Sequence, residues 1–172
     1  MELQDLDRPG GEWLRGEGER VDIVISSRVR LARNLAGYPF TIRADEDQRR
    51  EITRRLRDRL ADLHLPSKHL FVELEDADRL DARFLMERHL ISRELESGRG
   101  PRGVAFGSDE VVRVMVIEAD QLRILAIHRA LSIDETWAAG VVIDRSLVSD
   151  LDFAASTDLG YLTACPTNVG TG

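Results

Sequence analysis

Apolar side chains recur every three or four residues between positions 45 and 63, and this period predicts the clearest helix of the chain. The inward positions of this helix are Ile52, Leu56, Leu60 and Leu63. Acidic residues fill its first turn, where the positive end of the helix dipole favours them. Arginines alternate with acids on the other faces, which indicates a solvated surface and not a ligand site. Pro66 is expected to end the helix.

Short β-branched runs and two further helices make up the rest of the pattern. Strands are predicted over residues 21–25, 70–74, 104–106, 111–117 and 122–127, and a Gly/Arg loop over 97–103. Helices are predicted over residues 78–90 and 133–148, with inward Leu80, Phe84, Leu85, Trp137, Val141, Val142 and Leu147. Tight connections at 107–110 and 118–120 join three successive strands, which indicates an antiparallel meander and not a βαβ repeat. The predicted fold class is α+β, an antiparallel sheet flanked by helices.

Residues 23–34 are the stretch in which the pattern first indicates chemistry. An apolar run ends in two serines, after which arginines alternate with apolar residues. In an extended segment Arg28 and Arg30 project to one face, while Val29 and Leu31 face the other. Neighbouring guanidinium groups repel unless an anion lies between them, and their planar forks suit phosphate or carboxylate. The stretch is therefore either a polyphosphate-binding edge or an ordinary strand end with solvated arginines.

Composition narrows the class of protein. The 172 residues are enough for one domain with a core, and the net charge of −7 argues against a general nucleic-acid binder. The single cysteine allows no intrachain disulfide. No run approaches the ~18 apolar residues of a membrane helix, and the polar start has no signal-peptide core. The cytoplasm is therefore the expected location, with neither membrane nor nucleic acid as a direct partner.

The end of the chain holds the second informative stretch. Cys165 is followed by Pro-Thr-Asn and then by Gly-Thr-Gly, which places a thiol at a turn beside hydroxyl and amide donors. Backbone N–H groups in such a turn can form an anion-binding nest. A lone cysteine is, however, more commonly a small buried apolar residue.

Four stretches together resemble the ATP:guanido phosphotransferase (phosphagen kinase) family. They occur in the family's order and span nearly the whole chain, and the last of them is the most specific. The stretches are Ser26-Ser27-Arg28-Val29-Arg30, Glu87-Arg88-His89-Leu90-Ile91-Ser92, Glu118-Ala119-Asp120-Gln121-Leu122-Arg123-Ile124 and Gly160-Tyr161-Leu162-Thr163-Ala164-Cys165-Pro166-Thr167-Asn168-Val169-Gly170-Thr171-Gly172. The second and fourth are similar to the bacterial protein-arginine kinase branch. So is the start of the chain, which has no room for the helical N-terminal domain of creatine and arginine kinases.

This resemblance implies transfer of the γ-phosphoryl group of ATP, with Mg²⁺, to a guanidinium nitrogen of protein-bound arginine. Such a reaction needs positioning and neutralisation of charge more than covalent help. By resemblance, the residues that contact or clamp the nucleotide are Ser26, Ser27, Arg28, Val29, Arg30, His89 and Arg123. An isolated histidine is about equally often a surface residue at a helix end. Cys165 matches the cysteine beside the guanidinium, where a thiolate would favour the cation.

One departure from the family lies in the catalytic loop. The family reads Asn-Glu-Glu-Asp-His where this chain reads Ile117-Glu118-Ala119-Asp120-Gln121. The glutamate that holds the guanidinium and serves as its base therefore aligns with Ala119. Loss of a catalytic base typically costs ~10²–10⁴-fold in rate. Glu118 keeps a carboxylate nearby and is, with Cys165, the candidate catalytic residue, although adjacent residues of an extended loop point apart.

The second departure is the end of the chain at Gly172, within a motif that in the family leads into further phosphate-binding arginines and a second catalytic glutamate. We therefore expect residues 1–20 to be a loose segment and residues 21–172 to be the N-terminal part of a catalytic domain that is incomplete at its C-terminus. The expectation is either a fragment of a longer chain or a truncated product with exposed strand edges.

Three functions compete at this point. The first is a protein-arginine kinase-like phosphotransferase that acts on arginine-bearing proteins, with an activator protein and protease–chaperone machinery as partners by resemblance. The second is a catalytically inactive relative that binds nucleotide or phosphoarginine and acts through protein contacts, which the alanine at 119 favours. The third, an unrelated acidic α+β binding domain, accords poorly with four motifs in family order.

Overall fold

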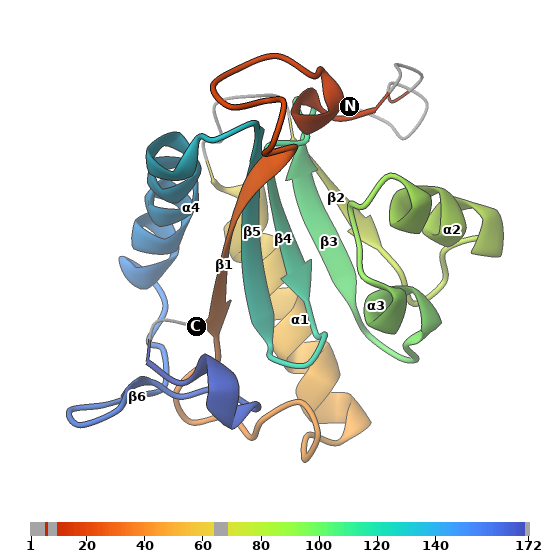
Figure 1. The fold of residues 1–172 in the computed structure, drawn as a ribbon. Helices are drawn as coiled ribbons and strands as arrows, with labels where there is room; N and C mark the ends of the chain where they lie inside the picture. The colour runs from red at the N-terminus through yellow and green to blue at the C-terminus, as the bar shows by residue number, and fades with distance from the viewer. Residues whose placement is uncertain (1–5, 7–9, 64–68, 171–172) are drawn as a thin grey trace.

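The computed structural model describes residues 6, 10–63 and 69–170, and its centre is one five-stranded antiparallel sheet (Figure 1). The strand order across the sheet is β1 (Ser26–Arg33), β5 (Leu122–Arg129), β4 (Val112–Val116), β3 (Gly103–Gly107) and β2 (His69–Glu73). Strands β3, β4 and β5 form the predicted meander, and β1 joins its edge from far earlier in the sequence. The predicted α+β class is confirmed.

Helices cover the two faces of the sheet unequally. On one face α1 (Glu46–Ala61) and α4 (Ile133–Val148) bury a core that includes Ile52, Leu56 and Ile124. On the other face α2 (Arg79–Glu87) and α3 (Arg93–Ser97) bury a second core around Leu85 and Phe106. In Figure 1, α2 and α3 lie beside β2 and β3, whereas β1, β5 and much of β4 have no helix in front of them. One half of this face is therefore left open.

The first helix forms as its sequence predicts. Asp45 accepts a hydrogen bond from the backbone N–H of Gln48, and the Gln48 side chain accepts one from the backbone N–H of Asp45. This reciprocal pair satisfies two N–H groups that have no partner within the helix. The predicted inward residues Ile52, Leu56 and Leu60 are all buried. The predicted stop at Pro66 lies outside the described residues.

The strand predicted over residues 21–25 is wrong, because the extended segment begins only at Ser26. The backbone N–H groups of Ile23 and Val24 both donate to the carbonyl of Arg20, which closes a turn in front of the strand. Strand β5 pairs with β1 only as far as Arg129 opposite Ser26, so residues 21–25 have no partner strand. Ile23 is accordingly 73% exposed.

The predicted inward faces of two helices also need correction. On α2, Leu80 is 74% exposed and Phe84 is also exposed, whereas Leu85 is buried as predicted, together with Ala82. On α4, Trp137 and Val142 are exposed, whereas Leu147 is buried as predicted, together with Ile143. Helix α3 interrupts the segment between the predicted helix and the Gly/Arg loop. An apolar residue on a short helix fits more than one face, and only the sheet decides which face is covered.

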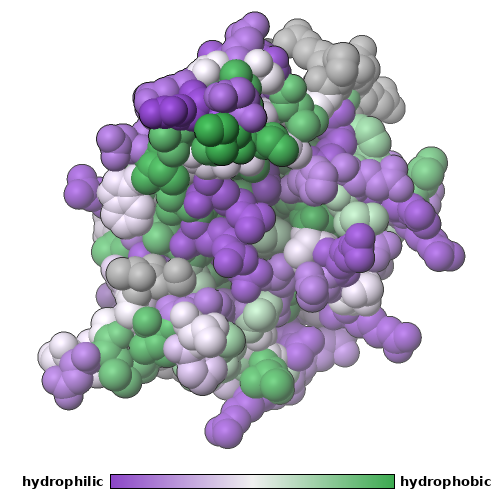
Figure 2. All heavy atoms as spheres, in the orientation of Figure 1, coloured by the Kyte–Doolittle hydropathy of each residue, from purple (hydrophilic) through white to green (hydrophobic). Residues whose placement is uncertain are grey.

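Short elements complete the described chain. They are two 3₁₀ turns, η2 (Glu12–Leu14) and η3 (Pro166–Asn168), and a two-residue hairpin of β6 (Ala155–Ser156) and β7 (Gly160–Tyr161). Across residues 6, 10–63 and 69–170, none of the helices has the length and apolar character needed to cross a membrane. Figure 2 shows hydrophilic side chains gathered across the middle of the face that the helices leave open.

Candidate functional site

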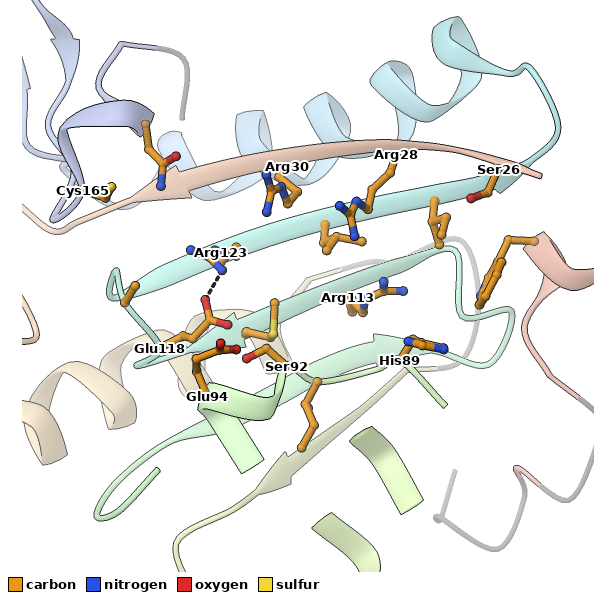
Figure 3. A pocket seen from close by; sticks show the side chains of 17 residues that line it. Ser26, Arg28, Arg30, His89, Ser92, Glu94, Arg113, Glu118, Arg123 and Cys165 are labelled. Atoms are coloured by element: carbon orange, nitrogen blue, oxygen red, sulfur yellow. Dashed lines mark ion pairs between the residues drawn. The ribbon is translucent and has the colours of Figure 1, made fainter. Parts of the chain in front are cut away.

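A cavity of about 1020 Å³ lies over the open half of the sheet (Figure 3). Its floor comes from β1, β4 and β5, and its walls come from the segment after α2, from α3 and from the loops at 118–119 and 165–168. Seven of the nine residues predicted for the site line it: Ser26, Arg28, Arg30, His89, Glu118, Arg123 and Cys165. Residues separated by up to 139 positions in sequence are thus brought to one cavity.

Strand alternation and register place the predicted arginines on one face. Arg28 lies opposite Ile127, Arg30 opposite Leu125, and Arg123 between Ala32 and Met115. Arg28 and Arg30 are both exposed to the cavity. Within the described ranges, neither of them has an acidic side chain at ion-pair distance. Two unneutralised guanidinium groups beside one another form a site suited to an anion.

Ser27 and Val29, which were also predicted to contact the nucleotide, do not line this cavity. The Ser27 hydroxyl is buried on the opposite face, where it donates to the carbonyl of Ala130 at 2.8 Å and accepts from the N–H of Ser132 at 2.9 Å. Val29 packs against the core below the sheet. The period of two in a strand explains both placements, and these side chains hold the strand rather than face a ligand.

The loop at 117–121 is held by a buried polar network. The Asp120 carboxylate accepts from the Asn34 side chain at 2.8 Å and from the backbone N–H of Ala164 at 2.6 Å. The Gln121 side chain accepts from the N–H of Leu35 and donates to the carbonyl of Pro39. Asp120 therefore ties the loop to Ala164, the residue before Cys165. This bond brings the Glu118 carboxylate and the Cys165 thiol to the same end of the cavity.

Glu118 turns its carboxylate into the cavity and forms an ion pair with Arg123. The carboxylate is 3% exposed, and neither of its oxygens has a well-aligned hydrogen bond with any described residue. Arg123 has five N–H donors in total, so donors are left for a second acid group. Glu118 and Arg123 thus supply a negative and a positive group at the thiol end of the cavity.

Cys165 is half-buried beside this pair, and its Sγ lies 2.9 Å from the Thr167 hydroxyl. The hydrogen bonds from Thr167 lower the pKa of the Cys165 thiol, because they stabilise the thiolate. Burial and Asp120 oppose this effect, and Arg123 adds to it. A thiolate here would attract a cation into the cavity.

Replacing Thr167 with valine is expected to raise the pKa of Cys165. Valine keeps the shape of threonine but removes the hydroxyl that bonds to the sulfur. The pH at which the thiol reacts at half its maximal rate with iodoacetamide should move up, because only the thiolate reacts. A matched change at the exposed Thr157 should leave this midpoint in place. An unchanged midpoint in the Thr167 variant would show that the hydroxyl does not stabilise the thiolate.

Ala119 lies at the rim where the first cavity adjoins a second of about 480 Å³. The residues that line both cavities are Glu94, Glu118, Ala119 and Cys165. The Ala119 methyl is exposed, and its carbonyl accepts a hydrogen bond from Thr41. The position that the motif resemblance aligns with a second carboxylate is therefore an open position between two cavities.

His89 reaches the opposite end of the cavity in a left-handed backbone conformation, with φ of 60°. Its N–H donates to Met86 and that of Leu90 donates to Leu85, which is the hydrogen-bond pattern that commonly ends a helix at glycine. Its ring packs edge to face against Trp13, and the two ring centroids are 5.5 Å apart. A histidine held at a glycine position carries strain, which favours a role for its ring in the cavity.

Replacing His89 with glycine is expected to stabilise the free chain while weakening nucleotide binding. Removing the Cβ relieves about 1 kcal/mol of left-handed strain. The melting temperature should therefore rise, and the affinity for ATP measured by calorimetry should fall because the ring is lost. A glycine variant that binds ATP as well as the parent chain would remove His89 from the site.

Ten of the lining residues were not named as site residues from the sequence, and five of these are polar or aromatic. Those five are Trp13, Ser92, Glu94, Arg113 and Asn168. Arg113 could have been found from the sequence, because it interrupts an apolar strand and alternation places it on the face opposite to Val112 and Val114. Glu94 had none, because helix α3 was not predicted and its carboxylate reaches the cavity only through the way α3 packs.

An antiparallel sheet with Arg28 and Arg30 on its open face, next to a carboxylate and a thiol, forms a site suited to an anion, as a phosphotransferase requires. Residues 51–172 match the family model described as "ATP:guanido phosphotransferase, C-terminal catalytic domain". The chain belongs to the ATP:guanido phosphotransferase family, as its motifs predicted.

Curated relatives agree with this assignment and with the predicted branch. The chain is 38% identical to the protein-arginine kinase of Halothermothrix orenii, an alignment that covers 100% of this chain and 49% of the relative. It is 39% identical to that of Symbiobacterium thermophilum, covering 97% and 48%. The chain thus spans about half the length of the curated relatives it matches.

Solved structures support the fold. The chain superposes on the duplicated taurocyamine kinase of Schistosoma mansoni, with bound transition-state analogue components, with a TM-score of 0.83 and 21% identity, covering 96% of this chain and 24% of that one. It superposes on a lombricine kinase with a TM-score of 0.75 and 20% identity, covering 96% and 51%. At this identity the likeness concerns the fold alone.

Proposed function

We propose that the chain supplies the nucleotide-binding part of a protein-arginine kinase, which transfers the γ-phosphoryl group of ATP to the guanidinium of an arginine in a protein. The observation that carries this proposal is the alignment of Arg28, Arg30 and Arg123 on one face, running toward Glu118 and Cys165. The names of the relatives support the acceptor, since they are protein-arginine kinases.

The arginines suit a triphosphate lying along the open face of β1 and β5. Charge-assisted hydrogen bonds from guanidinium to phosphate oxygen are among the strongest in proteins. The chain as a whole is acidic, with a net charge of −7, whereas Arg28 and Arg30 face the cavity without an acidic partner among the described residues. This contrast directs an anion to the cavity and away from the rest of the surface.

The second cavity suits the acceptor arginine, because it meets the first at Glu118 and Cys165. A carboxylate and a thiolate at that junction would hold the guanidinium cation against the γ-phosphate. In the reaction a guanidinium nitrogen forms the N–P bond, the bond between phosphorus and the bridging oxygen breaks, and ADP leaves with the electron pair. The nitrogen loses a proton, which Glu118, Glu94 or the Cys165 thiolate can accept.

The residues present fit a Mg²⁺ ion that arrives with the nucleotide rather than one held by the protein alone. Among the described residues no group of three or more His, Cys, Asp or Glu side chains is arranged to hold a metal. Mg²⁺ is commonly bound by substrate phosphates with one or two carboxylates. Glu118, whose oxygens lack aligned hydrogen bonds, and Glu94 are the carboxylates that could serve, and the ion would neutralise phosphate charge.

A nucleotide-binding protein without phosphotransfer activity is the second candidate function, and one observation favours it. The position of the family's second glutamate carries the exposed methyl of Ala119 at the rim of both cavities. In that case the same arginines would bind ATP or a phosphoarginine side chain, and the protein would act through its contacts.

Incubation with ATP, Mg²⁺ and an arginine-rich protein tests the proposal. The expected results are nucleotide binding by calorimetry and acid-labile phosphoarginine detected by mass spectrometry. Binding without product would favour the second candidate function. Absence of binding to ATP and to phosphoarginine would contradict both.

A further inference from the structure

Arg113 is a fourth arginine on the floor of the cavity, and it belongs to none of the motifs that define the family resemblance. It lies inside β4, opposite Leu125 of β5, and Leu125 in turn lies opposite Arg30 of β1. Arg30, Leu125 and Arg113 therefore form one row across three strands. Because residues of one row share a face, both guanidinium groups rise on the open side of the sheet.

Arg113 differs from the other cavity arginines in its burial. It is only 4% exposed, yet it lines the cavity. In the described part of the chain no side chain or carbonyl accepts a hydrogen bond from it. A buried cation without a partner is strongly unfavourable, so such a residue favours a compensating anion.

The neighbouring charges sharpen this point. Burial, and then the cation of Arg28, lower the pKa of Arg113 to about 10, and Glu110 opposes them only in part. Glu110 is already paired with Arg88, whose Nε donates to Oε1 at 3.1 Å. Arg113 therefore remains charged at neutral pH, next to a second cation, and the nearby Glu110 is paired through Oε1 with Arg88 and not with Arg113.

Figure 3 shows Arg113 between Arg28 and His89, away from the end formed by Glu118 and Cys165. Phosphoryl transfer belongs to the thiol end, so the γ-phosphate would lie near Arg123. The phosphates nearer the nucleoside would then lie toward Arg28 and His89, which is where the Arg113 guanidinium opens into the cavity.

We infer that Arg113 is a further phosphate-binding residue, which contacts the phosphates that ATP and ADP share. This inference rests on the proposed nucleotide site and adds a residue to it. A buried guanidinium is held rigidly, so little side-chain entropy is lost when it binds phosphate. It also makes the empty site unfavourable, because Arg28 and Arg113 repel until an anion arrives.

Substitution of Arg113 by methionine tests the inference through two readouts that move in opposite directions. Methionine fills a similar volume without charge, so the melting temperature of the free chain should rise by roughly 2–4 °C. Affinities for MgATP and for MgADP, measured by calorimetry, should both fall by roughly 10- to 100-fold, because each loses the same phosphate contact. Arg83→Met on α2, where Arg83 is 61% exposed and paired with Glu87, is the matched control and should change neither quantity.

The outcomes separate the inference from the proposed function. If the parent chain binds both nucleotides and Arg113→Met binds them equally well, the inference is overturned and the proposed function stands. If the parent chain binds neither nucleotide, the proposed function fails and the inference falls with it. Arg113→Gln, which keeps polarity and removes charge, serves if the methionine variant does not fold, and undiminished affinity in it would overturn the inference in the same way.

Discussion

Replacing Ala119 with glutamate is expected to raise the rate of phosphoarginine formation by ~10²–10⁴-fold, the usual contribution of a positioned base. The new carboxylate would project from the rim shared by the two cavities, where the acceptor guanidinium is proposed to lie. The change should leave stability nearly unaltered, because the Ala119 side chain is exposed and the loop is held by Asp120 and Gln121. Mass spectrometry of an arginine-rich protein after incubation with ATP and Mg²⁺ gives the rate.

Ala119→Gln is the matched control, since it has the size of glutamate and no basic carboxylate. It should leave the rate at the level of the parent chain. If the glutamate variant binds ATP but, like the parent, forms no phosphoarginine, position 119 does not carry the missing base. If the parent forms phosphoarginine as fast as the glutamate variant, Glu118 or Glu94 suffices, and the proposal of an inactive relative is wrong.

Replacing Arg28 with methionine is expected to weaken ATP binding by about 100-fold, which corresponds to the loss of one or two charge-assisted hydrogen bonds. Unlike Arg113, Arg28 is exposed, so its removal should barely change the melting temperature of the free chain. Calorimetry at 50 mM and 200 mM salt provides the measurement. The loss should be larger at low salt, because screening weakens the interaction in the parent chain as salt rises.

The exposed Arg83 again provides the control, since its change to methionine removes the same charge far from the cavity floor. Retained affinity after Arg28→Met would remove Arg28 from the phosphate site. It would also contradict the interpretation that the two neighbouring arginines of β1, Arg28 and Arg30, bind an anion together.

Much of the sheet could be predicted from local sequence because its central strands follow one another. The turn at 107–110 and the connection at 118–120 join neighbours, so β3, β4 and β5 pair as the pattern indicates. Alternation also predicted that Arg28 and Arg30 share a face. Helix α1 was predicted because its period and its Asp45 cap agree with one another.

Other features depended on partners far away in the sequence. The strand predicted over 21–25 failed because β5 offers no residues to pair with it. The faces of α2 and α4 were misjudged because apolar residues on several sides of a helix compete until a sheet covers one of them. The motif resemblance placed Ser27 in the nucleotide-contacting segment. Hydrogen bonds of its hydroxyl with Ala130 and Ser132 hold this side chain on the face away from the cavity.

The sequence by itself determined the family, the α+β class and the presence of two arginines on one side of an extended segment. Only the tertiary structure decided that this side stays uncovered, because α2 and α3 pack beside β2 and β3 and leave β1 and β5 without a helix in front of them (Figure 1). The same packing brought Arg113 beside Arg28 and left it buried, with no acidic side chain of the described residues at ion-pair distance. The surroundings of a charged side chain depend on strands such as β1 and β5, which pair although they lie about a hundred residues apart in the sequence. No local pattern encodes that pairing.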